Sequence, residues 1–136
     1  MSKAALKLAV LKRANGCCEY CKSQVKYSSD SFSIEHIVSC KRHGSDAFSN
    51  LAFACQGCNN HKHACTVAID PLSGASVRLF HPRNQHWNEH FTWTDDYSIV
   101  VGITAVGRAT VARLKLNRSG LINQRKALAS IGKHPA

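Results

Sequence analysis

The sequence has few acidic residues for its length. Its 136 residues include eight Asp and Glu against eighteen Lys and Arg, which gives a formal net charge of +10. No acidic residue follows Asp96, whereas residues 101–136 hold seven basic residues. A positive charge of this size indicates a polyanionic partner, most simply nucleic acid. We favour this interpretation over the alternative that the charge serves solubility alone.

Long apolar runs, proline and glycine are also sparse. There are three Pro and eight Gly, and 44% of the residues are apolar, which excludes collagen-like and disordered classes. No apolar run approaches the roughly 18 residues that a membrane-spanning helix needs. Residues 1–13 alternate Lys with apolar residues and lack the apolar core of a secretory signal. We therefore expect a cytoplasmic protein without membrane contact.

The pattern of apolar residues and turn signals predicts an α+β fold in one domain, residues 1–136. Residues 13–66 would form the core, and residues 67–136 a β-hairpin and basic helical extension. Strands are expected at 32–38 and 50–54, and hairpins at 66–80 and 91–101. Helices are expected at 2–14, 56–64, 105–116 and 120–130, the last two as a C-terminal pair, with Ser2, Thr104 and Ser119 as N-caps.

Seven cysteines in a reducing compartment indicate metal binding more than disulfides. Four of them form two Cys-x-x-Cys pairs, Cys18 with Cys21 and Cys55 with Cys58. Two such pairs complete a closed, tetrahedral, structural Zn²⁺ site that would join the two ends of the intervening segment. The remaining three, Cys17, Cys40 and Cys65, are interpreted as small buried apolar residues.

The order of motifs across residues 13–62 resembles the HNH endonuclease family. The residues that carry the resemblance are Arg13-Ala14, Cys18-Glu19-Tyr20-Cys21, Glu35-His36-Ile37, Gly44, Asn50-Leu51, Cys55-Gln56-Gly57-Cys58-Asn59 and Lys62. The resemblance implies a ββα-metal nuclease finger, with residues 32–38 and 50–54 as its strands and 56–64 as its helix.

The resemblance also implies roles for individual residues. His36 would be the general base that deprotonates the attacking water, which suits an imidazole near neutral pH. Glu35 and Asn59 would bind one divalent cation, Mg²⁺ or Mn²⁺, and Asn50 would fix the loop that orients His36. His63 lies four residues after Asn59 and is an alternative ligand, with which softer ions such as Ni²⁺ would be tolerated better.

Basic residues beside the expected site and along the C-terminal helices are candidates for DNA phosphate contacts. They are Lys41, Arg42, Lys62, Arg83, Arg108, Arg118 and Arg125. Contacts of this kind give affinity without sequence specificity.

The predicted function is metal-dependent endonuclease cleavage of DNA. A monomer or weak homodimer would nick one strand at a time with weak sequence preference. Two alternatives stay open: a zinc-bearing nucleic-acid-binding module without catalysis, and a toxin or effector nuclease. The sequence does not decide between DNA and RNA, or between biological roles.

Overall fold

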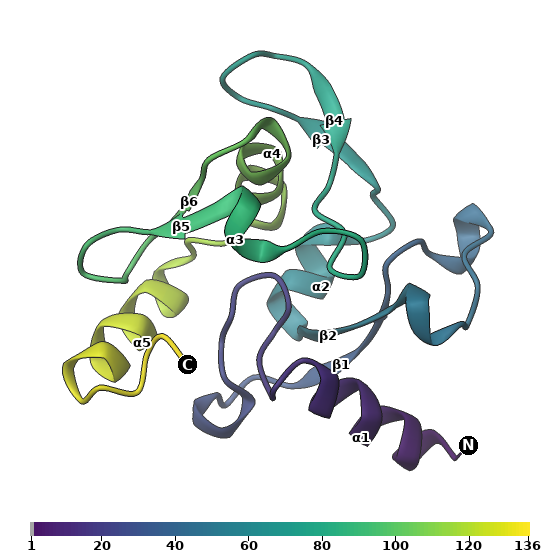
Figure 1. Ribbon diagram of the computed structural model, residues 1–136, viewed down its shortest axis with the longest axis horizontal. Helices are drawn as coiled ribbons and strands as arrows, with labels where there is room; N and C mark the ends of the chain where they lie inside the picture. The colour runs from purple at the N-terminus through teal and green to yellow at the C-terminus, as the bar shows by residue number, and fades with distance from the viewer. Residues whose placement is uncertain (1) are drawn as a thin grey trace.

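The computed structural model describes residues 2–136 as an α+β fold of five helices and three two-stranded antiparallel sheets, with short 3-10 turns between them (Figure 1). The helices are α1 (Lys3–Arg13), α2 (Gln56–Lys62), α3 (Trp87–His90), α4 (Ala105–Leu114) and α5 (Ser119–Ser130). The strands are β1 (Phe32–His36), β2 (Leu51–Cys55), β3 (Val67–Ile69), β4 (Ser76–Arg78), β5 (Phe91–Trp93) and β6 (Val100–Gly102). No helix in residues 2–136 is both long and apolar enough to cross a bilayer.

The strand pair β1–β2 and helix α2 form the centre of the N-terminal half. In the antiparallel register Glu35 lies opposite Ala52 and His36 opposite Leu51. Every residue of β2 is buried, so this strand is covered on both faces. Cys55 ends β2 and caps α2, because its Sγ accepts a hydrogen bond from the Cys58 backbone N–H at 3.5 Å. Strand and helix therefore meet at a cysteine.

Most predicted elements are present, and several of them are shorter than predicted. Strand β2 is shifted by one residue, and α5 begins one residue earlier than expected. Ser2 and Thr104 cap α1 and α4 as expected, through bonds from the backbone N–H groups of Ala5 and Gly107. Ser119 is the first residue of α5, and its N-cap is Arg118. The short helix α3 was not predicted, because four residues are too few to show a helical period.

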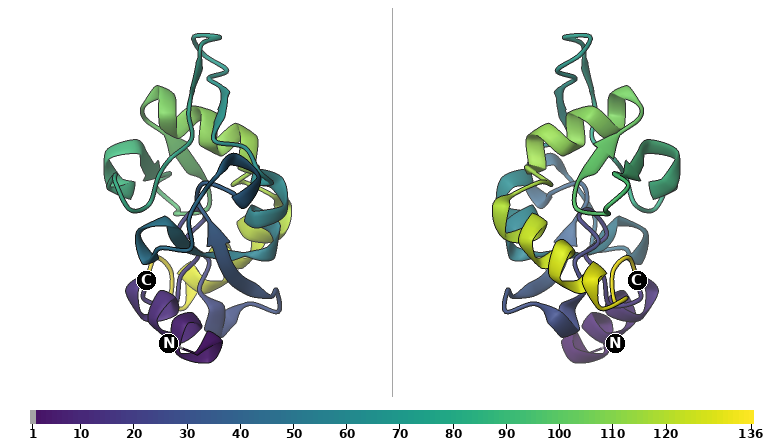
Figure 2. Two further views of the ribbon diagram at one scale, coloured as in Figure 1. Left: turned by 90° about the vertical axis from the view of Figure 1, so that its right-hand side faces the viewer. Right: turned by 90° about the vertical axis from the view of Figure 1, so that its left-hand side faces the viewer.

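The two halves share one apolar core. Phe53 of β2, Phe80 after β4, Phe91 of β5 and Leu114 of α4 belong to the same buried cluster. The β3–β4 hairpin extends from the rest of the molecule at the end opposite α1 (Figure 1 and Figure 2). Its turn is fixed by Asp70, which is fully buried and accepts two hydrogen bonds from the Arg108 guanidinium group, each at 2.9 Å.

Two glycines permit close backbone approaches. A Cβ on Gly107 of α4 would lie 1.9 Å from the carbonyl oxygen of His90, and a Cβ on Gly44 would lie 1.7 Å from that of Val38. Any side chain at either position would collide with backbone, so the chain must move there if glycine is replaced. Gly44 lies in the loop between β1 and β2, beside the expected catalytic residues.

Candidate functional site

The four cysteines of the two Cys-x-x-Cys pairs come together in a buried group, the four-cysteine cluster. The sulfur atoms of Cys18, Cys21, Cys55 and Cys58 all lie within 4.8 Å of one another. Cys18 and Cys21 sit on a tight turn that ends at Lys22, whose φ of 65° is left-handed. Four buried sulfur ligands at this spacing fit a closed tetrahedral zinc site and leave no position for substrate.

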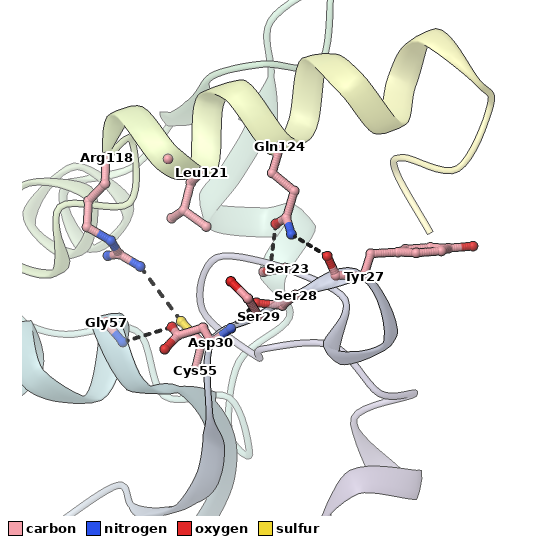
Figure 3. A pocket seen from close by; sticks show the side chains of 11 residues that line it. Ser23, Tyr27, Ser28, Ser29, Asp30, Cys55, Gly57, Arg118, Leu121 and Gln124 are labelled. Carbon is pink, nitrogen blue, oxygen red and sulfur yellow. Dashed lines mark hydrogen bonds between the residues drawn. The ribbon is translucent and has the colours of Figure 1, made fainter.

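The guanidinium group of Arg118 compensates part of the negative charge of the four-cysteine cluster. Arg118 Nη2 donates to Cys55 Sγ at 3.7 Å (Figure 3). It also donates to Cys58 Sγ at 3.6 Å. Burial lowers the pKa of Arg118, but the thiolates of Cys58 and Cys55 outweigh burial and the net shift is upward. The side-chain hydrogen bonds among the four cysteines lower the pKa of Cys55 and raise the pKa of Cys21.

Arg118 also borders an open pocket of about 590 Å³ between α5 and residues 23–30. Gln124 of α5 closes one side of it, with bonds to the Ser23 hydroxyl and the Tyr27 carbonyl (Figure 3). Arg118 points from the start of α5 toward the sulfurs, so it stabilises the four-cysteine cluster and is not free for a DNA phosphate.

Glu35 is buried and paired with other side chains, whereas a ligand of a catalytic metal ion would need an open position. It is 4% exposed, its Oε1 accepts from Lys62 Nζ at 2.6 Å, and its Oε2 accepts from the Tyr20 hydroxyl at 2.7 Å. Lys62 is 2% exposed and also donates to the Ile37 carbonyl at 2.8 Å. A divalent ion at Glu35 would have to displace this ammonium group, so the arrangement does not fit the ion expected between Glu35 and Asn59. The expected contact of Lys62 with a DNA phosphate is also wrong, because its ammonium group is buried and bonded to Glu35 and Ile37.

The Glu35–Lys62 pair makes a prediction about stability. Burial raises the pKa of Glu35, and the ammonium group of Lys62 opposes that rise. Lys62→Met leaves the carboxylate buried without a cation, which should cost about 3–5 kcal/mol at pH 8. Because the folded state then holds a proton more tightly than the unfolded state, the deficit should shrink as pH falls from 8 to 6.

The check is chemical unfolding of Lys62→Met across this pH range, with the double variant Glu35→Gln/Lys62→Met as control. The double variant has no carboxylate to protonate at position 35, so its stability should vary with pH no more than expected from the rest of the chain. A deficit of Lys62→Met that is equal at pH 6 and pH 8 would contradict the argument.

Three further arginines predicted to bind DNA have structural partners. Arg83 forms an ion pair with Glu19, and Arg108 forms the bidentate pair with Asp70. Arg125 is 3% exposed and donates to the carbonyls of Ser98, Leu116 and Cys21 and to the side chain of Asn117. These guanidinium groups hold the fold together, so their expected role as phosphate contacts is corrected. Of the seven predicted contacts, Lys41 and Arg42 are the exposed ones.

His36 lies at the end of β1 with its side chain 32% exposed. Its Nε2 is 2.8 Å from Oδ1 of Asp46, whose side chain is 90% exposed. The ring therefore has an acidic partner and access to solvent, which a general base needs. Asp46 was not predicted, because nothing in the sequence marks this loop residue as a partner of a strand residue ten positions earlier.

Asn50 joins the two sides of the loop that contains Asp46. Its Oδ1 accepts from the Val38 N–H at 2.9 Å, and its Nδ2 donates to the carbonyls of Val38 at 2.9 Å and Ser45 at 2.7 Å. Arg13 of α1 fixes the next segment, donating to the carbonyls of Phe48 and Leu51. These bonds set the position of Asp46 relative to His36.

Asn59 and His63 border a shallow groove of about 390 Å³ between α2 and the loop after β1. Lys41 borders the same groove, whereas Glu35 does not. Helix α2 ends at Lys62, so the exposed His63 lies just beyond it with a φ of 53°. The structure thus brings Lys41, Asn59 and His63 together on one face and separates Glu35 from them.

Cys40 differs from its interpretation as a small buried residue. It is exposed, whereas Cys17 is buried and Cys65 half-buried. Its Sγ, a His36 ring nitrogen and an Asp46 carboxylate oxygen lie within 4.8 Å of one another, which is the second group of metal-binding atoms in the described residues 2–136. Nothing in the spacing of these residues along the sequence indicates this second group.

Comparison with known proteins finds a family model that matches the same segment. Residues 18–64 match the family model described as HNH endonuclease. Searches of curated proteins and of solved structures give no match. The matched segment includes the whole four-cysteine cluster, His36, Asn50 and Asn59. Residues 18–64 of this chain are therefore similar to an HNH endonuclease domain, over the segment that carries the resemblance in sequence.

Proposed function

We propose that the protein is an endonuclease that hydrolyses phosphodiester bonds in DNA, with His36 as the general base. The observation that carries the proposal is the position of His36 within the HNH domain: a partly exposed imidazole held by Asp46 on a loop that Asn50 fixes. Because Asp46 accepts the Nε2 proton, the lone pair on Nδ1 is available to accept a proton from water.

Exposed charge beside His36 suits a phosphate backbone. Lys41 and Arg42 lie in the 3-10 turn η2 (Cys40–Arg42), and the Arg42 Nε donates to the Ala64 carbonyl at 2.7 Å. This bond fixes the guanidinium group next to the groove that Asn59 and His63 border. Contacts of these two side chains with phosphate would position DNA without reading its sequence.

Two metals belong to the proposal in different roles. Zn²⁺ in the four-cysteine cluster would hold the HNH domain together, as in other sites of this ligand set. A catalytic divalent ion, for which Mg²⁺ and Mn²⁺ are the first candidates, finds Asn59 and His63 at the groove but not the paired Glu35. The ββα-metal finger would then consist of β1, β2 and α2, with one site per chain that nicks one strand at a time.

The proposal is tested with supercoiled plasmid incubated in EDTA, Mg²⁺, Mn²⁺ or Ni²⁺. We expect conversion to nicked circles that requires an added divalent ion, with linear product appearing later by second events. A shift of plasmid mobility without strand breaks in any metal would favour the alternative, a basic zinc-bearing binding module. Parallel reactions with single-stranded DNA and RNA define the substrate class.

A further inference from the structure

We propose that His36, Cys40 and Asp46 form a second metal site, which takes a soft divalent ion such as Zn²⁺ and thereby removes His36 from catalysis. The site is separate from the four-cysteine cluster, and the binding part of the proposal stands on geometry alone. The effect on catalysis rests on the proposed function.

The three ligand atoms are already close enough to share one ion. They lie within 4.8 Å of one another, and His36 Nε2 and Asp46 Oδ1 are 2.8 Å apart. With zinc–ligand bonds of about 2.0–2.3 Å, tetrahedral geometry separates ligand atoms by about 3.3–3.8 Å. Shifts of the order of 1 Å in exposed side chains would therefore convert the hydrogen-bonded group into a coordinated one.

The backbone that carries these ligands is held in place before any ion binds. Asn50 bonds to Val38, two residues from both His36 and Cys40, and to Ser45, which precedes Asp46. The Gly44 N–H also donates to the Ser39 carbonyl at 2.9 Å, and the missing Cβ of Gly44 allows this closure. A site whose backbone is fixed loses less conformational entropy on binding an ion.

The ligand types select the ion. One thiolate and one imidazole favour Zn²⁺, Co²⁺ or Ni²⁺, whereas Mg²⁺ prefers oxygen ligands in octahedral geometry. Three protein ligands leave a fourth position for water. Cys40 and Asp46 are exposed, unlike the buried sulfurs of the four-cysteine cluster. The second ion should therefore exchange with a chelator well before the first.

Coordination has a direct consequence for His36. A neutral imidazole has one nitrogen lone pair, and while Asp46 accepts the Nε2 proton that lone pair is on Nδ1. An ion bound to either ring nitrogen takes this lone pair and leaves none to accept a proton, and Asp46 would at the same time change from hydrogen-bond partner of the ring to metal ligand. Zinc at this site should therefore inhibit Mg²⁺-supported nicking, and the inhibition should depend on Cys40, which has no part in the proposed hydrolysis.

The binding test counts metal in the full chain. In the first measurement, zinc-loaded protein is gel-filtered and its zinc content is measured. In the second, Co²⁺ is added to a separate preparation in which only the four-cysteine cluster holds zinc. Wild type should hold two equivalents of zinc and give the near-ultraviolet absorption of a single thiolate–cobalt bond. Cys40→Ala should hold one equivalent of zinc and lose this absorption. Its affinity for Co²⁺ should fall more than about a hundredfold, which exceeds the loss caused by replacing a residue that only hydrogen-bonds to a metal ligand.

Cys65→Ala is the matched control, because Cys65 is another free cysteine outside both groups. It should behave as wild type in every measurement, and circular dichroism should show both variants folded. A wild type that holds one equivalent of zinc, or a Cys40→Ala variant that binds the second ion as wild type does, would overturn the site.

The inhibition test compares each protein with its own rate in Mg²⁺. Zinc at one equivalent beyond the four-cysteine cluster should reduce wild-type nicking at least tenfold and leave Cys40→Ala nearly unaffected. Equal inhibition of both proteins would refute the link to His36 while leaving the metal count intact. Absence of nicking in both would refute the proposed function alone.

Discussion

Withdrawal of zinc from the four-cysteine cluster is expected to unfold the protein rather than merely inactivate it. Four buried cysteines join the turn at residues 18–21 to the junction of β2 and α2. Structural zinc binds with an apparent free energy of about 10–16 kcal/mol near neutral pH. A domain of this size is stable by only about 5–15 kcal/mol, so little stability would remain once the ion is removed.

Tryptophan fluorescence follows this transition, because the two tryptophans, Trp87 and Trp93, pack together with ring centroids 5.4 Å apart. Trp87 is buried, and its Nε1 donates at 3.0 Å to the carbonyl of Tyr20, which lies between Cys18 and Cys21 in the sequence. A strong zinc chelator should shift the emission to longer wavelength and abolish helical circular dichroism, and added zinc should restore both. Cys18→Ser should show the same loss without chelator.

Cys17→Ser is the matched control for Cys18→Ser. Cys17 precedes Cys18 and is also buried, but its Sγ contacts the Asn15 carbonyl and is not part of the four-cysteine cluster. Its replacement should leave the zinc content unchanged. The structural role would be refuted if metal analysis showed that zinc had been removed and the protein still kept its fluorescence and its thermal unfolding midpoint.

The cysteine pairing and most elements could be predicted from the sequence because they depend on local chemistry. A Cys-x-x-Cys pair needs only a tight turn, an N-cap needs one hydroxyl near its helix, and the turn at 70–74 needs Asp, Pro and Gly in order. Each of these signals spans a few residues, so one sequence displays it. The matching family segment at 18–64 agrees with the resemblance drawn from the same residues.

The partners of charged side chains could not be predicted in the same way. Arg108 pairs with Asp70, 38 residues earlier, and Arg125 bonds to the Cys21 carbonyl, 104 residues earlier. The run of basic residues after Val101 indicates a charge, but it does not tell which guanidinium groups reach solvent. Arginine's planar group with five donors also suits buried carbonyls and carboxylates, so a basic helix can be structural rather than DNA-binding.

The residues expected to be catalytic show the same limit at short range. The sequence predicted a strand at 32–38 that contains Glu35 and His36, whereas β1 ends at His36. Alternation along a strand puts these two side chains on opposite faces. It did not reveal that the face of Glu35 turns inward to Lys62 and Tyr20. Nor did it reveal that the face of His36 meets Asp46 and Cys40. Loop conformation, set by Asn50 and Gly44, decides these contacts.

Replacement of His36 with alanine is expected to slow DNA nicking by about 10²- to 10⁴-fold, the usual contribution of a positioned general base. DNA affinity should change little, since the phosphate contacts proposed for Lys41 and Arg42 remain. Measured as a single-turnover rate at saturating protein, the loss should fall on the chemical step. Gel-shift midpoints of variant and wild type should agree within about threefold, which corresponds to less than one unit of log Kd.

His43→Asn supplies the matched control, because it removes an exposed imidazole from the same loop. His43 has a left-handed φ of 65°, a conformation that asparagine tolerates better than alanine does. This variant should nick at the wild-type rate. Asp46→Asn should fall between the two, since a neutral amide keeps a hydrogen-bond partner for Nε2 but removes the carboxylate charge that stabilises the protonated ring. If His36→Ala nicked as fast as His43→Asn, the base would have to be another residue, and the contact between His36 and Asp46 would be left as part of the second metal site alone.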